Sequence, residues 1–267
     1  MYQEHFGLSR RPFVETTDPA AYVELPSRDA ALRRLRYGLE QAQGPVVLYG
    51  PPGTGKSIAA RKLALEMQTT PLFVSFPSLP AADLLALLLA ELVGDSDPPP
   101  PPSVVVRRLR DALAQTVRRG HRHLLVVDEA HLIRDPATFD VLHLLLNFAT
   151  AGPPDLALVL VGDTELLLRL PAGLGERLVA RSLLAPLSPA ETTGYVLGRL
   201  AAAGASQPLF TTEALDTLHR GSDGIPRRIN LLADLALLIA YARGEPHADA
   251  KTVSIAASEL FPDPLAA

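Results

Sequence analysis

The sequence contains no cysteine among its 267 residues. This absence excludes disulfides, thiolate nucleophiles, iron–sulfur clusters and cysteine-type zinc sites. Long apolar runs are also missing, because the best candidates, Leu84–Ala90 and Leu235–Ala242, are much shorter than the roughly 20 residues that cross a bilayer. Residues 1–12 carry charges and proline, unlike a signal peptide. We therefore expect a cytoplasmic protein without direct membrane insertion.

An excess of positive charge is missing as well. The chain has 25 Lys and Arg against 29 Asp and Glu, a net charge of -4, which excludes a globally basic nucleic-acid coat but not a local basic surface. Hydrophobic residues make up 48% and charged residues 20% of the chain, a composition typical of folded domains. The length fits one large or two small domains.

Five short apolar runs predict β-strands, and helical stretches separate the first four. Because their residues are apolar at consecutive positions, these strands are expected to be covered on both faces, as in a mostly parallel α/β sheet. The expected strands are Val46–Tyr49, Leu72–Phe76, Leu124–Val127, Leu156–Val161 and Leu183–Leu187.

Only helices are expected after Leu187. Ser188 and Glu191 form a capping box that opens a helix to about Ala203. Further helices are expected at 212–220, 226–243 and about 248–260. Five prolines, Pro98–Pro102, predict an extended polyproline connector between two helices, with a recognition site for a proline-binding groove as the alternative.

The segment from Gly50 to Ser57 satisfies G-x-x-x-x-G-K-[ST] between a predicted strand and a predicted helix. Such a loop directs backbone N–H groups at phosphate oxygens, next to the positive end of a helix dipole. Lys56 is expected to reach the β- and γ-phosphates, and the Ser57 hydroxyl to bind Mg²⁺. The predicted nucleotide-binding residues of the loop are Gly50, Pro51, Pro52, Gly53, Thr54, Gly55, Lys56, Ser57 and Ile58.

Asp128 and Glu129 end an apolar strand about 70 residues downstream, in the pattern of a Walker B segment. We expect Asp128 to hold Mg²⁺ and Glu129 to polarise the attacking water. ATP is the expected nucleotide, because neither Asn147 nor Asn230 begins the Asn-Lys-x-Asp segment that reads guanine. Residues 128–131 also spell DEAH, but a helicase of that type needs two α/β domains.

The phosphate loop, the Asp-Glu strand and the helices that follow them resemble those of an AAA+ ATPase. The resemblance implies a P-loop three-layer αβα core with a five-stranded parallel sheet, followed by a small helical lid. Within AAA+, the N-terminal pattern and the later Leu35-Arg36-Tyr37-Gly38 resemble the ExeA family, also called general secretion pathway protein A, over about residues 1–260. The N-terminal pattern is Tyr2-x-x-x-Phe6-Gly7-Leu8-x-x-x-Pro12-Phe13. The expected segments are 1–44, an arm and first helix, 45–187, the nucleotide-binding core, and 188–267, the lid.

The resemblance implies roles for several further residues. Arg181 matches the arginine finger that acts on a neighbouring subunit, with Arg177 as a second candidate. Arg227 matches the sensor 2 arginine of the lid. Sensor 1 is open between Asp163 and Thr164; we expect Thr164 to act there, because an Asp carboxylate would repel the γ-phosphate.

The N-terminal arm has two interpretations. By family analogy it wraps the adenine, with Phe6, Leu8 and Phe13 as candidates. Equally, these side chains suit an arm that is simply docked and buried.

The resemblance also implies a homo-oligomer and a protein partner, with the secretion or pilus machinery as the leading candidate. Two alternatives remain: a DNA-binding regulator like the transposition ATPase TnsC, and a slowly hydrolysing nucleotide-dependent switch. A row of arginines before the Asp-Glu strand could meet nucleic-acid phosphates, although a solvated helix face is favoured. The row comprises Arg107, Arg108, Arg110, Arg118, Arg119 and Arg122.

Overall fold

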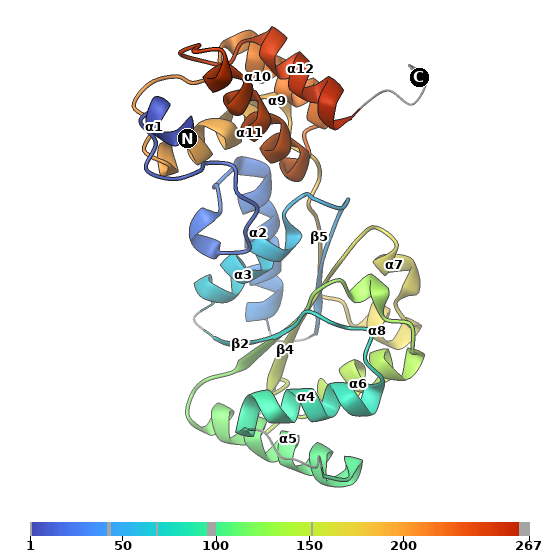
Figure 1. Cartoon of the computed structure of the whole chain (residues 1–267). Helices are drawn as coiled ribbons and strands as arrows, with labels where there is room; N and C mark the ends of the chain where they lie inside the picture. Colours follow the sequence, from blue (N-terminus) through green and yellow to red (C-terminus); the bar gives the residue numbers. More distant parts are fainter. Residues whose placement is uncertain (1, 42–43, 68, 95–99, 151, 262–267) are drawn as a thin grey trace. The chain divides into compact units, whose positions relative to one another are not determined.

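A computed structural model describes residues 2–41, 44–67, 69–94, 100–150 and 152–261 (Figure 1). The contacts divide the chain into two compact units, which we describe separately. The lid unit comprises Met1–Asp29, Pro51–Ile58 and Ala185–Ala267, and the core unit comprises Ala30–Gly50 and Ala59–Leu184. This grouping follows contacts rather than chain order, and the division into 1–44, 45–187 and 188–267 stays a prediction.

The core unit is built on a five-stranded parallel sheet, which confirms the predicted α/β class. Its strands follow the order β2-β3-β4-β1-β5, so β1 lies between β4 and β5. The strands are β1 (Val46–Tyr49), β2 (Thr70–Val74), β3 (His123–Val127), β4 (Leu156–Gly162) and β5 (Ala180–Leu183).

The prediction for the fifth strand was wrong. The structure has β5 at Ala180–Leu183, whereas the apolar run Leu183–Leu187 begins where this strand ends. β5 is an edge strand with an exposed Arg181, and therefore lacks the continuous apolar pattern of the central strands. The Leu184 amide still donates to the Tyr49 carbonyl at 2.7 Å, and the chain then leaves the sheet.

The helices of the first part of the chain are α1 (Tyr2–His5), α2 (Pro26–Glu40), α3 (Lys56–Glu66), α4 (Ala81–Val93), α5 (Pro102–Arg118), α6 (Pro136–Leu145), α7 (Leu166–Arg169) and α8 (Ala172–Glu176). Short 3-10 turns occupy Pro19–Ala21 and Ala130–Leu132. The predicted polyproline segment falls partly on residues 95–99, which lie outside the described residues. Pro102 is the first residue of α5.

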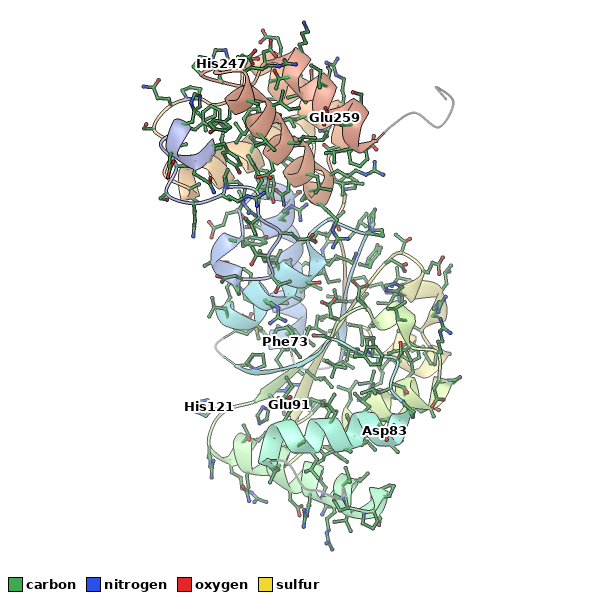
Figure 2. The ribbon with its side chains drawn as sticks, viewed as in Figure 1. Phe73, Asp83, Glu91, His121, His247 and Glu259 are labelled. Atoms are coloured by element: carbon green, nitrogen blue, oxygen red, sulfur yellow. The ribbon has the colours of Figure 1, made fainter. Side chains whose placement is uncertain are left out.

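The central strands β3, β4 and β1 of the sheet are buried on both faces. Residues at alternate positions, such as Val47, Leu125 and Leu160, share one cluster with residues of α4, α5 and α6. The intervening residues, such as Leu48 and Val159, are also fully buried. α4 and α5 lie side by side (Figure 1), and on the edge strand β2 the Arg61 guanidinium lies 4.4 Å from the ring centroid of Phe73, which Figure 2 labels. Burial on both faces explains the consecutive apolar residues.

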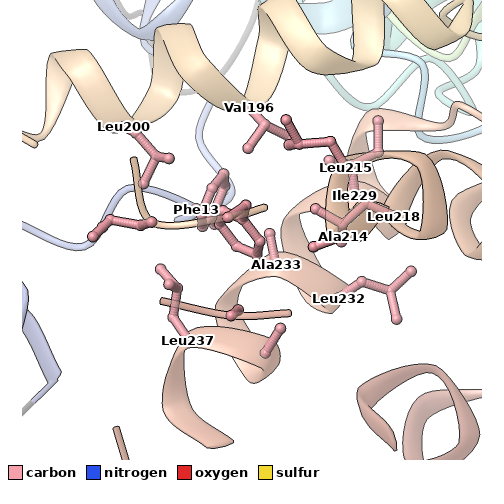
Figure 3. Close-up of a cluster of buried hydrophobic side chains, with 14 of the residues drawn as sticks. Phe13, Val196, Leu200, Ala214, Leu215, Leu218, Ile229, Leu232, Ala233 and Leu237 are labelled. Carbon is pink, nitrogen blue, oxygen red and sulfur yellow. The ribbon is translucent and has the colours of Figure 1, made fainter. Parts of the chain in front are cut away.

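The lid unit joins the two ends of the described chain in one hydrophobic core (Figure 3). Phe13 of the N-terminal arm packs edge-on against Phe210, with ring centroids 6.2 Å apart. The buried Arg199 holds the arm by donating from Nε to the Pro12 carbonyl and from Nη2 to the Val14 carbonyl, each at 2.8 Å. The lid helices are α9 (Pro189–Ala202), α10 (Thr212–Ser222), α11 (Pro226–Ala242) and α12 (Ala250–Leu260).

The predicted capping box is confirmed at the start of α9, with Ser188 and Glu191 each bonded to the other's backbone amide. Within the part of the chain that the structure describes, no helix has the length and apolar character needed to cross a bilayer.

Gly224 provides a stability test of the lid unit. It adopts φ +68, and a Cβ added there would collide with the Leu187 carbonyl oxygen, whereas Gly244 adopts φ +69 with nothing within 4 Å of such a Cβ. We expect Gly244→Ala to lower the free energy of unfolding by about 1 kcal/mol, because alanine is strained in a left-handed backbone conformation. Gly224→Ala should lower it by about 3 kcal/mol or more, because the clash adds to this strain. Urea unfolding measures both; equal losses would contradict the predicted clash.

Candidate nucleotide site

The loop predicted to bind phosphate connects β1 to α3 and depends on glycine. Gly53 and Gly55 adopt φ +80 and +88, values that side chains rarely tolerate. A Cβ on Gly53 would lie 3.0 Å from the Cβ of Arg227 and 3.0 Å from the Cγ2 of Ile225. The loop therefore needs glycine at this position both for its backbone angle and for its close approach to the start of α11.

Internal hydrogen bonds fix the loop. Lys56 is only 7% exposed, and its Nζ donates to the Pro51 carbonyl at 3.0 Å. The Thr54 hydroxyl donates to the same carbonyl at 2.9 Å. A buried ammonium and a helix N-terminus within one curled segment suit the triphosphate of a nucleotide, because both favour anionic oxygens.

Arg227, the predicted sensor 2 residue, lies against this loop. Its amide donates to the Gly53 carbonyl at 3.2 Å. Its guanidinium meets the Glu15 carboxylate, with Nη2 2.6 Å from Oε1. The structure therefore brings Arg227 to the loop, and it adds Glu15 as a partner that sequence reasoning did not identify.

Arg28, near the start of α2, is a second residue that sequence reasoning missed. It is 5% exposed, and its Nη1 donates to the Thr54 carbonyl of the loop. Its Nη2 is buried without a hydrogen-bond partner among the described residues, and burial lowers the pKa of this guanidinium from its usual value. Nothing in the sequence distinguishes Arg28 from Arg33 and Arg34 of the same helix.

A cavity of about 500 Å³ lies between the N-terminal arm and α11. Phe13 lines it together with Arg227, Asn230 and other residues of both segments. Of the three adenine candidates, Phe6 and Leu8 are buried in the lid core, as a docked arm requires, and only Phe13 also borders the cavity. A volume of this size lies within the range of small-ligand sites.

The carboxylates of the core unit lie at the carboxyl ends of β3 and β4. The Asp128 side chain accepts a hydrogen bond from the Glu129 amide at 3.0 Å, and Glu129 itself adopts a left-handed φ of +50. The imidazole of His131 lies between two acids: its Nδ1 is 3.5 Å from Glu129 Oε2 and its Nε2 is 3.4 Å from Asp163 Oδ2. His131 therefore links the predicted catalytic glutamate to the sensor 1 position.

The strand order explains why these side chains meet. All strands are parallel, so their carboxyl ends share one edge of the sheet, and β4 separates β3 from β1. Asp128 follows β3, Asp163 follows β4, and Gly50 follows β1. The phosphate loop thus leaves the sheet at the edge that carries the carboxylates, the usual ligand edge of such sheets.

The structure leaves the remaining predicted residues apart from these contacts. Thr164 is exposed, and Asp163 accepts a hydrogen bond from the Glu165 amide at 2.9 Å. Arg181 is exposed on the edge strand β5, and it has no polar partner among the described residues. Arg177 donates from Nη1 to the Asn147 side-chain oxygen at 2.8 Å. The roles of Thr164, Arg177 and Arg181 stay predictions.

A family model described as "AAA domain" matches residues 38–170. General secretion pathway protein A of Aeromonas hydrophila is 39% identical over 97% of this chain. The chain belongs to the AAA+ family of P-loop proteins and is related to general secretion pathway protein A. It spans about half the length of that curated relative, 48%.

Solved AAA+ structures share this fold. Cdc6p from Pyrobaculum aerophilum has a TM-score of 0.73 and 19% identity, covering 94% of this chain and 71% of its own. The RuvB Holliday junction branch migration motor of Thermotoga maritima has a TM-score of 0.65 and 20% identity, covering 94% of this chain and 74% of its own. At these identities, the likeness confirms the AAA+ fold alone.

Lys56 gives the most direct test of the loop. We expect Lys56→Ala to weaken ATP binding about 100-fold, because a charge-assisted contact to the phosphates is lost. Lys62→Ala is the matched control, since Lys62 lies on the same helix and pairs with Glu66 at 3.6 Å. Titration with a fluorescent ATP analogue measures both affinities, and equal affinity of the Lys56 variant and the parent would refute the loop assignment.

Proposed function

We propose that this AAA+ protein binds Mg-ATP at the loop 50–57 and hydrolyses it. The observation that carries this proposal is the buried Lys56 within a glycine-dependent loop that leaves the sheet at the edge carrying Asp128 and Glu129. Phosphoryl transfer depends mainly on positioning and on neutralising charge, and this arrangement offers groups for both.

Each residue has a defined role in this proposal. Lys56 and the loop amides bind the phosphate oxygens, and Ser57 and Asp128 would hold Mg²⁺, which would neutralise charge on the phosphates. Glu129 accepts a proton from the attacking water. The imidazole of His131 orients the Glu129 carboxylate and also engages the Asp163 carboxylate. Thr164 then remains as the neutral side chain that acts as sensor 1. Arg227 gives up its ion pair with Glu15 and binds the γ-phosphate instead.

The proposal includes a homo-oligomer, because a finger arginine acts on the site of a neighbouring subunit. Arg181 is the candidate that the exposed edge of β5 presents, and Arg177 is the second candidate. The related protein's name points to general secretion. We therefore propose that this protein hydrolyses ATP in the cytoplasm and thereby drives assembly or remodelling of a secretion or cell-envelope complex.

A mixing experiment tests the shared site. Glu129→Gln is expected to retain ATP binding but stop turnover, and Arg181→Ala to lower turnover about 10³-fold or more. Mixed together, the two inactive variants should recover activity, because a Glu129-intact site then meets an Arg181-intact neighbour. Steady-state ATPase assays over a range of protein concentrations measure this recovery.

Two results of the same assay are informative. Recovery with Arg177→Ala in place of Arg181→Ala assigns the finger to Arg177. No recovery with either arginine variant, together with a parent turnover per subunit that does not rise with concentration, contradicts the shared site.

One observation favours a second function, binding to nucleic acid. Two pairs of exposed arginines lie about three turns apart on α5 and its C-terminal cap, and one member of each pair, Arg107 and Arg118, lies opposite the buried face of the helix. These arginines have no polar partner among the described residues, whereas Arg110 lies 3.3 Å from Asp111. The neighbouring helix α4 carries Asp83 and Glu91 (Figure 2). The pairs are Arg107 with Arg108 and Arg118 with Arg119.

Salt-dependent DNA binding tests this second function. If α5 contacts phosphates, Arg107→Glu with Arg118→Glu should weaken binding to duplex DNA and reduce the slope of log affinity against log salt by about 2. The control exchanges Arg33 and Arg34, exposed on α2, for glutamate. Equal effects of both double variants, or no DNA binding by the parent in ATP, would exclude a specific role of α5.

A further inference from the structure

The lid unit holds a buried positive charge that makes no ion pair among the described residues. Arg28 is 5% exposed, and no carboxylate of the described residues lies within ion-pair distance of its guanidinium. Glu191, an acid in the surroundings, has its carboxylate engaged by the amides of Ser27 and Ser188, at 3.0 and 3.2 Å. Arg28 therefore has no ion pair within the described chain, and Glu191 attracts its charge only from beyond ion-pair distance.

Burying a charge in this way is costly unless a partner compensates it. Proteins almost always pair buried cations or give their donors hydrogen bonds, since an unpaired buried charge loses its hydration without return. Arg28 makes one such bond, from Nη1 to the Thr54 carbonyl, while Nη2 has no acceptor in the part of the chain that the structure describes. A buried donor next to a binding loop needs an acceptor, which either an ordered water or a ligand can supply.

The position of the guanidinium beside the phosphate loop indicates a phosphate group as the ligand. Its Nη1 lies 3.5 Å from the position of a Cβ on Gly55, and the Cγ2 of Ile58 lies at the same distance from that position. Arg28 therefore contacts the loop beside the first turn of α3, where the sequence motif predicts the phosphates. A planar guanidinium can bond two acceptors at once, so one side chain can hold the loop and a phosphate oxygen together.

We propose that Arg28 is a nucleotide-binding residue: Nη1 fixes the phosphate loop through the Thr54 carbonyl, and Nη2 donates to a phosphate oxygen of the bound nucleotide. This inference rests on the proposed binding of ATP at the loop. It assigns a positive charge to the site from outside the phosphate-loop motif and from outside the lid helices.

A purely structural arginine makes a different prediction. If Arg28 served only to hold the loop, its removal would lower the stability of the free protein. The affinity for nucleotide would then fall only in proportion to the loss of stability. If it binds phosphate, Arg28→Met removes both an uncompensated buried charge and one hydrogen bond. These two effects on the free protein oppose each other, and the affinity for nucleotide falls on its own.

The test uses the full chain and four proteins: the parent, Arg28→Met, Arg28→Lys and the control Arg33→Met on the exposed face of α2. Calorimetric titration with ATP and with ADP, both with Mg²⁺, gives the affinities, and thermal unfolding without nucleotide gives the stability. We expect Arg28→Met to unfold within a few degrees of the parent and to lose about ten- to hundredfold in affinity for both nucleotides. Arg28→Lys should lose less, because it keeps the charge, and Arg33→Met should bind like the parent.

Three outcomes would overturn the inference: parent-like affinity in a folded Arg28→Met, affinity lost only in proportion to stability, or an equal loss in Arg28→Lys and Arg28→Met. If Arg28→Met does not fold, Arg28→Lys decides, with a loss of severalfold supporting the inference and unchanged affinity opposing it. Failure of the parent itself to bind ATP would instead refute the proposed function.

Discussion

The backbone of the loop between β1 and α3 is the constraint on which the site depends. Gly53 and Gly55 have positive φ angles, and these allow the chain to turn from the edge of a buried parallel sheet directly into a helix. Without that turn, Lys56 would not be buried beside the N-terminus of α3, and the positive ends of the backbone dipoles would not face one small volume. The absence of a side chain at Gly53 also lets the start of α11 pack against the loop.

The two units contain different kinds of candidate site groups. The lid unit contributes cations to the loop from three separate segments: Lys56 from the loop itself, Arg28 from α2 and Arg227 from α11. The core unit contributes the carboxylates Asp128, Glu129 and Asp163 at the ends of β3 and β4. A nucleotide with a bound divalent cation needs both, because the phosphates require positive partners and the metal requires oxygen ligands.

Sequence patterns predicted the elements that are buried throughout. They failed for an element that combines buried and exposed residues. Strands β1, β3 and β4 are buried on both faces and so show as apolar runs, whereas β5 carries Arg181 and Ser182 at a sheet edge and was misplaced. The loop and the Asp-Glu pair follow fixed local spacing, which a motif captures. Arg28 with Thr54, Glu15 with Arg227 and His131 with Asp163 are contacts between distant positions of the chain, and only the fold brings them together. Local sequence carries no sign of such pairs.

A structure of the full chain with a non-hydrolysable ATP analogue and Mg²⁺ is the decisive test of nucleotide binding at this loop. We expect phosphate oxygens within hydrogen-bond distance of the amides of residues 53–57 and of Lys56 Nζ, with Mg²⁺ bound through Ser57. A nucleotide bound elsewhere on the protein, or a loop that keeps its present contacts with no nucleotide at saturating concentration, would contradict it.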